Sequence, residues 1–246
     1  MRRACILLLL LSPVLGRAAA PALLHDAIQK LIADDDHWAY TQSTQRFDRR
    51  GKPEGGLTVE RYDPSQPTER QWQLLQFRGH APTEWELTSW QSQKEKTMKH
   101  HGEKTLGDVL DLDHAGLASE TAAVATFLVP IMKDASKRFP ADKLEVFMLV
   151  DKTQRALASF SLRPKAPFRI AGVMKVESGE VDGRLEVVQA QYAPTLVWAR
   201  GSGAARILGF IPYGMGAEVN YTAFRRVSPY NDRFEVKIGD IKALNF

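Results

Sequence analysis

The sequence predicts an α+β protein that is mostly β, in which a few helices pack against one antiparallel sheet. Along most of the chain after Trp38, β-branched and aromatic residues alternate with polar ones, which is the period of a strand. The links between these stretches are short and polar or contain Gly and Pro, and such links join antiparallel strands. No repeat and no break in composition divides the chain, so we expect one domain after an N-terminal segment.

The first twenty residues have the layout of a secretory signal peptide. Two arginines follow Met1, a largely apolar run extends from Ala4 to Leu15, and three alanines stand at Ala18–Ala20. The apolar run is too short to span a bilayer. We therefore expect cleavage near Ala20, a periplasmic location, and a single domain over residues 21–246.

The mature chain is expected to lack disulfides, because the only cysteine, Cys5, lies in the segment to be removed. Removal of Arg2, Arg3 and Arg17 leaves 30 of the 33 lysines and arginines, against 29 acidic residues. This near-neutral balance gives no support for a nucleic acid partner. With 44% hydrophobic residues and no further long apolar run, the mature chain should be globular and without a transmembrane segment.

Two longer helices are predicted. Apolar residues recur at intervals of three and four within 21–36, which makes one apolar stripe. Thr83 and Glu86 have the spacing of a capping box, so a second helix should begin there and run toward Lys96, with a polar linker beyond it. Shorter helical segments are expected at 106–110 and 130–139.

Many stretches have the composition and period of strands. The charged, proline-containing stretch Arg61–Leu75 is predicted as the corner of a hairpin rather than as a reactive loop. Gly201–Gly203 and Tyr213–Gly216 are predicted as hairpin turns, because neither stands between a strand and a helix as a phosphate loop requires. The predicted strands are 38–47, 57–62, 71–77, 121–129, 144–150, 156–162, 168–177, 183–192, 195–203, 207–214 and 219–227.

Several predicted strands have apolar residues on both faces. In the stretch 168–177, for example, Phe168 and Ile170 alternate with Ala171 and Val173. A sheet that is covered on one face and curved around something apolar on the other accounts for this pattern. The apolar material is either the protein's own helices or a ligand.

One segment resembles a known family. The sequence RYDPS at Arg61–Ser65, WQLL at Trp72–Leu75, Gly79, and Pro82-Thr83 with Glu86 follow an N-terminal helix. This order is similar to that of periplasmic proteins related to the lipoprotein carrier LolA. The resemblance covers most of the mature chain in element type, and its specific part is the segment from Arg61 to Glu86.

The resemblance implies an incomplete antiparallel β-barrel whose concave apolar face is covered by helices. It implies that acyl chains of lipoproteins or other lipids bind between sheet and helices, without catalysis and without a cofactor. The arginine that locks the lid of the carrier is not assigned to one position, because Arg46, Arg61 and Arg78 are all candidates.

Aromatic and apolar side chains on the second helix and on the strands are the candidates for a ligand site. The two tryptophans of that helix either pack it permanently onto the sheet or plug the cavity of a movable lid. The strand residues either line the cavity or form ordinary core. These candidate ligand-binding residues are Trp85, Trp90, Phe168, Ile170, Met174, Trp198 and Phe210.

No metal site is predicted. The adjacent histidines of residues 100–103 diverge and lack the helical spacing of zinc ligands. Residues 111–116 begin like an EF-hand loop, but alanines replace its third ligand and its closing glutamate. The acidic run at 34–37 is interpreted as a solvated helix end.

No catalytic residue is predicted either, because there is no GxSxG elbow and Ser92 and Lys96 stand on an exposed helix. The first hypothesis is a non-enzymatic periplasmic protein that binds a lipid or the acyl chain of a lipoprotein, as a carrier in envelope biogenesis. Its partners would be that lipid and an envelope protein. Two alternatives stay open: an envelope scaffold with a filled core, and a hydrolase of envelope lipids or glycans.

Overall fold

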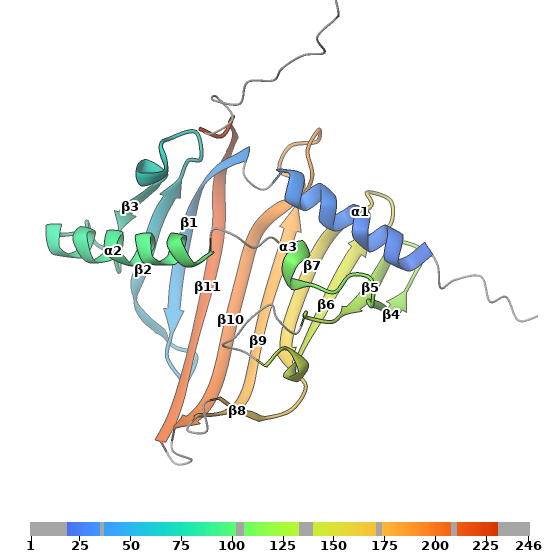
Figure 1. Ribbon diagram of the computed structural model, residues 1–246. Coiled ribbons are helices and arrows are strands. Elements are labelled where there is room, and N and C mark those ends of the chain that lie inside the picture. The colour runs from blue at the N-terminus through green and yellow to red at the C-terminus, as the bar shows by residue number, and fades with distance from the viewer. Residues whose placement is uncertain are drawn as a thin grey trace, which may run out of the picture.

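A computed structural model describes residues 19–34, 37–101, 106–132, 140–170, 174–207 and 211–230. These residues form one open, curved antiparallel sheet with helices on its concave face, which confirms the predicted fold class (Figure 1). The strand order is β3-β2-β1-β11-β10-β9-β7-β6-β5-β4, and β8 pairs with β9. The described sheet therefore ends at β3 on one side and at β4 on the other, so the barrel is incomplete.

The helices are α1 (Ala19–Asp34), α2 (Glu84–His101) and α3 (Leu106–Val109), with 3₁₀ turns at Thr68–Arg70 and Ala141–Lys143. The strands are β1 (Trp38–Phe47), β2 (Pro53–Tyr62), β3 (Trp72–Gln76), β4 (Gly116–Glu120), β5 (Val124–Val129), β6 (Leu144–Asp151), β7 (Ala156–Pro164), β8 (Phe168–Ile170), β9 (Met174–Glu186), β10 (Thr195–Ile207) and β11 (Ile211–Arg226). Among the described residues, no helix is apolar over the length that a membrane crossing needs.

The first and last strands meet in the middle of the sheet. β1 pairs with β11 from Trp38 opposite Arg226 to Phe47 opposite Gly216. This pairing joins the β1–β3 meander to the β4–β7 meander through the three long strands β9, β10 and β11. The sheet thus has two wings with a long central section between them.

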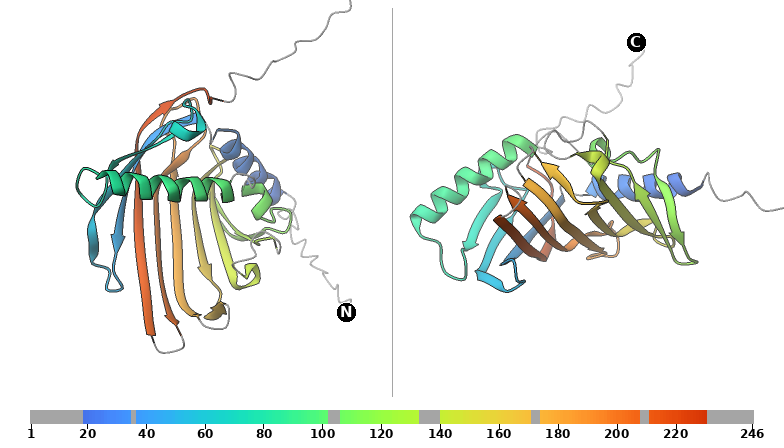
Figure 2. Two further views of the ribbon diagram at one scale, coloured as in Figure 1. Left: turned by 60° about the vertical axis from the view of Figure 1, so that its left-hand side comes forward. Right: turned by 90° about the horizontal axis from the view of Figure 1, so that it is seen from below.

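Both long helices lie on the same side of the sheet, α1 over one wing and α2 over the other (Figure 2). We call this side the inner face and the opposite side the outer face. Residues that pair directly across neighbouring strands point to the same face. The register therefore assigns each side chain of the central section to one face.

The apolar core lies between α1 and the β4–β7 wing. The apolar stripe of α1 packs here, with Leu24 and Ile28 fully buried, as the spacing in the sequence predicts. Phe127 of β5 and Val150 of β6 are also fully buried. We call this set the dry core: Leu24, Ala27, Ile28, Leu110, Leu112, Ala125, Phe127, Val129, Val146, Met148, Val150, Leu157 and Leu185.

The corner at Arg61–Leu75 is a structural corner, as predicted. Asp63 accepts hydrogen bonds from the backbone N–H and the hydroxyl of Ser65, at 3.1 and 2.6 Å. Arg225 of β11 donates to the same carboxylate at 2.8 Å. The carboxylate therefore caps the turn and ties it to the centre of the sheet.

The main correction concerns the C-terminal strands. The predicted turns Gly201–Gly203 and Tyr213–Gly216 lie within β10 and β11 and pair with each other, with Gly203 opposite Met215. Three predicted strands are therefore two long ones. Glycines placed on alternate residues fit a pleated strand wherever one face needs to be free of side chains.

Other boundaries also differ from the predictions. The predicted strand 183–192 is confirmed only over 183–186, because β9 ends at Glu186 and the chain then turns toward β10. β4 was not predicted, since GLASE at Gly116–Glu120 is exposed throughout and carries little apolar signal. The polar linker expected after Lys96 is helical up to His101; Met98 and Lys99 in this stretch are good helix formers. In the predicted helix 130–139, Ile131 instead bridges to Leu110, and 133–139 lie outside the described residues.

Candidate ligand-binding face

A shallow apolar floor lies on the inner face between the two wings. Gly201 pairs with Val181 on one side and with Ala217 on the other, and Gly203 pairs with Met215. Because several of these residues are glycine or alanine, no large side chain fills this part of the inner face. We call the following set the floor: Val181, Ala199, Gly201, Gly203, Met215, Ala217 and Val219.

Apolar side chains of the floor remain accessible in the described chain. Val181 is 40% exposed and Met215 is 57% exposed, although both are on the face that carries the helices. Tyr213, one pair further along β11, is 43% exposed. Apolar side chains left on the concave side of a sheet mark a surface that gains free energy when something apolar covers it.

Phe160 of β7 separates the floor from the dry core. It pairs with Gly183 of β9 on the inner face, and a Cβ at Gly183 would lie 2.2 Å from the Phe160 ring. Only glycine therefore allows the ring to lie across β9. The floor ends at this ring, and the side chains beyond it pack against α1.

Two cross-strand rows connect the dry core, the floor and the α2 wing. The first row contains, in order from the dry core to the α2 wing, Val129, Val146, Leu162, Val181, Gly201, Ala217, Arg46 and Glu54. The second row runs in parallel through Phe127, Met148, Phe160, Gly183, Ala199, Val219, Thr44 and Thr58. Along both rows the inner face changes from fully apolar to polar and charged.

Helix α2 is attached to the sheet through a buried carboxylate. Glu60 of β2 is 6% exposed and accepts hydrogen bonds from Gln42 and from the indole N–H of Trp90. The ammonium of Lys94 lies 2.8 Å from the same carboxylate and 3.7 Å from the centre of the Trp72 ring. Two residues one turn apart on α2 therefore converge on one charged group of the sheet.

Near its start, α2 leaves apolar side chains exposed. Trp85 is 77% exposed and Leu87 is 38% exposed. The predicted capping box is confirmed: the Thr83 N–H donates to the Glu86 carboxylate at 2.9 Å, and the Glu86 N–H donates to the Thr83 hydroxyl. The hydrogen bonds that the Glu86 carboxylate accepts from the N–H and the hydroxyl of Thr83 hold the pKa of Glu86 below its usual value. The N-terminus of α2 is therefore well capped, whereas its attachment to the sheet is concentrated at Glu60.

A cavity of about 430 Å³ lies between α2 and the β1–β2 hairpin. Its walls combine three cationic side chains with two acids, two threonine hydroxyls and two aromatic rings. The lining residues are Thr44, Arg46, Glu54, Gly55, Gly56, Thr58, Glu60, Phe77, Arg78, Trp90, Gln93 and Lys94. The cavity is next to the floor, because Arg46 pairs with Ala217.

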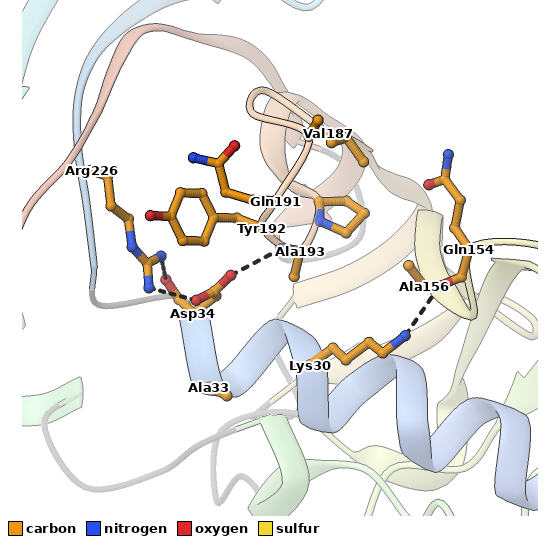
Figure 3. A pocket seen from close by; sticks show the side chains of 12 residues that line it. Lys30, Ala33, Asp34, Gln154, Ala156, Val187, Gln191, Tyr192, Ala193 and Arg226 are labelled. Carbon is orange, nitrogen blue, oxygen red and sulfur yellow. Dashed lines mark hydrogen bonds and ion pairs between the residues drawn. The ribbon is translucent and has the colours of Figure 1, made fainter.

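A second cavity of about 740 Å³ lies at the end of α1 (Figure 3). Here the polar groups mainly bond to one another: Arg226 lies 2.7 Å from the Asp34 carboxylate, which also accepts from the Ala193 N–H at 3.0 Å. The guanidinium also lies over the Tyr192 ring, at 4.3 Å from its centre. We interpret this site as the joint that fixes α1 to the sheet, rather than as the ligand site.

The predicted ligand-binding residues fall in three places. Trp85 projects into solvent and Trp90 lies in the α2 attachment. Trp198 pairs with Asn220 and Arg184 on the outer face, with the Arg184 guanidinium 5.9 Å from the centre of its ring.

The remaining candidates belong to the lower end of the central section. Phe168 and Ile170 of β8 pair with Val176 and Met174 of β9. Val176 pairs with Ala205 of β10, which is the neighbour of Tyr213 on the inner face. Phe168, Ile170 and Met174 therefore share the face of the floor, whereas Phe210 lies outside the described residues.

The described residues contain no group of three or more His, Cys, Asp or Glu side chains placed to hold a metal ion. In the stretch that begins like an EF-hand loop, Asp111 bonds to a neighbouring side chain. Its carboxylate lies 2.8 Å from the His114 ring, and this hydrogen bond raises the pKa of His114. Asp113 pairs with His25 of α1 at 3.0 Å. Asp34 belongs to the α1 joint, and residues 35, 36 and 102–105 lie outside the described chain.

Sequence reasoning missed the floor glycines, Glu60 and the arginines of the cavity. One signal for the floor was present: Gly201 and Gly203, like Gly214 and Gly216, are two residues apart, which is the period of a strand. No local signal marks Glu60, because its partner Trp90 is thirty residues away in the sequence.

Comparison with known proteins adds little to this geometry. No protein family model matches the sequence, and no curated protein matches it at the threshold applied. Among solved structures, the chain is similar to a LolA superfamily protein from Nitrosomonas europaea, with 8% sequence identity and a TM-score of 0.40. The alignment covers 88% of this chain and 97% of that protein. A likeness at this level assigns neither a family nor a function.

Proposed function

We propose that this protein is a non-enzymatic, periplasmic binding protein for the acyl chain of a lipid or lipoprotein, which lies on the floor between α1 and α2. The observation that carries the proposal is the floor itself. Apolar side chains such as Val181 and Met215 remain 40% and 57% exposed beside glycines on the concave face. A flexible chain without polar groups fits a long surface of this kind.

The energetics favour such a ligand. Burial of one methylene group contributes about 0.8 kcal/mol. A chain that buries a dozen methylenes therefore gains on the order of 10 kcal/mol before the costs of ordering and association are subtracted. No catalytic residue and no cofactor is needed for tight binding.

The attachment of α2 supports a lid that moves. The helix is held by Glu60 rather than by a dry interface, and Trp85 is 77% exposed. A ligand that enters above the floor can displace a helix of this kind without opening the dry core. Transfer of the cargo to an envelope protein is part of the same proposal.

The first experiment is solvent extraction and mass spectrometry of the mature chain, purified from a periplasm without detergent. We expect lipid in a stoichiometric amount. The same protein, once delipidated, should bind dodecanoylglycerol, an uncharged single-chain lipid, in a titration that follows tryptophan fluorescence. A chain that is purified without lipid and does not bind this probe would support the filled scaffold instead.

A substitution on the floor makes this test specific. A Cβ at Gly201 would meet the Val181 methyl at 3.7 Å, an ordinary contact, so Gly201→Val should fold and raise the floor. We expect at least a tenfold loss of affinity for dodecanoylglycerol and an unchanged Tm. The matched control is Ser202→Val, the next residue on the outer face, which should bind as the wild type does. Equal affinities of the two variants would contradict the proposal.

A further inference from the structure

The cavity beneath α2 contains charge that an acyl chain does not use. Arg46, Arg78 and Lys94 line it, together with the carboxylates of Glu54 and Glu60. Lys94 and Glu60 compensate each other at 2.8 Å. Apart from this pair, the charged groups of the cavity are two guanidinium groups and one exposed carboxylate.

Neither arginine forms an ion pair within 4.0 Å in the described chain, although the charge of Arg78 helps to lower the pKa of Glu86. Arg46 and Glu54 are cross-strand neighbours, yet no ion pair within 4.0 Å joins them among the described residues. The Arg78 guanidinium lies over the Phe77 ring, at 5.3 Å from its centre. Guanidinium groups bind phosphate and carboxylate through paired hydrogen bonds, so both groups are available for an anion.

The backbone holds Arg78 in place. Its φ of 48° is in the left-handed region, which is unfavourable for a residue other than glycine. A Cβ at Gly56 would lie 2.5 Å from the Arg78 carbonyl oxygen, so β2 and this turn are in close contact. An arginine kept in a strained conformation at the wall of a cavity is better placed to bind a ligand than an arginine on a flexible loop.

The register links this cavity to the floor. Arg46, Ala217 and Gly201 are successive members of one cross-strand row on the inner face. Neighbouring strands are about 4.8 Å apart, so the arginine is roughly 10 Å from the centre of the floor. A single amphipathic molecule can therefore occupy both.

We propose that the cavity binds the anionic head group, a phosphate, of a lipid whose chain lies on the floor. Arg46 and Arg78 would hold the phosphate, and the hydroxyls of Thr44 and Thr58 can donate further hydrogen bonds. The volume of about 430 Å³ accommodates a phosphate with a small substituent. This inference rests on the proposed function, because the chain of the same molecule occupies the floor.

The test compares three probes by isothermal titration below their micelle concentrations. Dodecyl phosphate has both the chain and the charge, dodecanoylglycerol has the chain alone, and inorganic phosphate has the charge alone. We expect dodecyl phosphate to bind at least tenfold more tightly than either of the others. Binding of inorganic phosphate with equal affinity would identify a site for free phosphate and overturn the lipid head group.

Charge variants separate the head group from the chain. The double variant Arg46→Gln, Arg78→Gln should lose at least tenfold in affinity for dodecyl phosphate and stay within twofold for dodecanoylglycerol. The matched control is Arg61→Gln, Arg70→Gln, which removes the same charge outside the cavity and should leave both affinities unchanged. The single variant Arg46→Gln serves as a second test that leaves the Arg78 turn intact.

The outcomes distinguish the two proposals. If dodecanoylglycerol binds and is lost in Gly201→Val, but the arginine variants bind dodecyl phosphate as the wild type does, the head-group inference is wrong and the proposed function remains. If Gly201→Val changes no affinity and dodecanoylglycerol does not bind, the proposed function fails. The head-group inference then fails with it.

Discussion

The two helices on the inner face differ in how they are held. α1 inserts Leu24 and Ile28, both fully buried, into the dry core. α2 places Trp90 and Lys94 against a single carboxylate and leaves Trp85 77% exposed. One sheet therefore carries one helix fixed by apolar burial and another fixed by charge and hydrogen bonds.

Because of this difference, we expect the α1 side of the molecule to be the more stable one and α2 to be able to move away from the sheet. Apolar burial is spread over many contacts and depends on no single partner. A buried ion pair adds little net free energy when complete, but the loss of one partner leaves the other charge uncompensated. We therefore expect α1 to open only when the protein unfolds, and α2 to open while the sheet stays folded.

The largest expected effect tests the dry core. Phe127→Ala removes a fully buried ring beneath α1 and should lower the free energy of unfolding by about 3–5 kcal/mol, because the cavity cannot be refilled. Urea denaturation followed by circular dichroism measures it. The control is Leu128→Ala, the next residue, which is 37% exposed on the outer face and should lose about 1 kcal/mol or less. Equal losses would contradict a core confined to the inner face.

A smaller effect is expected at the α2 attachment. Glu60→Gln keeps the shape of the side chain but removes the charge that Lys94 faces, so the attachment should weaken by about 1–3 kcal/mol. Hydrogen exchange should become faster throughout α2 and stay unchanged in α1. Trp90 fluorescence should shift to the red as its indole N–H is exposed to water.

The control for this effect is Glu54→Gln, a carboxylate of the same cavity that is exposed and forms no ion pair with α2 in the described chain. It should change neither the exchange rates nor the fluorescence. If Glu60→Gln accelerated exchange in α1 as much as in α2, the two helices would open together and the comparison would fail.

The sequence predicts the two helices because their signals are local. The apolar stripe of α1 and the Thr83–Glu86 capping box each depend on residues within one or two helical turns. The glycines of β10 were misinterpreted because Gly-x-Gly occurs both in turns and in strands. Their cross-strand neighbours decide between the two, and Met215 is twelve residues from Gly203.

The candidate site is less predictable still. From the sequence, Glu60 is interpreted as an exposed charge at the edge of a strand. In the structure α2 lies over β2, and Glu60 is only 6% exposed. Trp198 alternates like a core residue, yet the register places it on the outer face beneath an arginine. Pairing partners distant in the sequence determine both outcomes.

The smallest effect is a response to pH at the start of α2. Hydrogen bonds from Thr83, with His80 and Arg78 nearby, hold the pKa of Glu86 below its usual value. A lowered pKa in the folded chain means that the ionised carboxylate stabilises the first turn. This stabilisation is complete above the usual pKa of a glutamate and is lost as the pH falls through the lowered value.

A titration by nuclear magnetic resonance tests this sign. The Thr83 amide, which donates to Glu86, should shift with a midpoint below the usual pKa of a glutamate. Glu86→Gln keeps a neutral acceptor for the Thr83 amide, so the amide should no longer respond to acid, whereas Glu84→Gln should leave its response intact. A Thr83 midpoint at or above the usual pKa of a glutamate would mean that the capping box does not hold the ionised form.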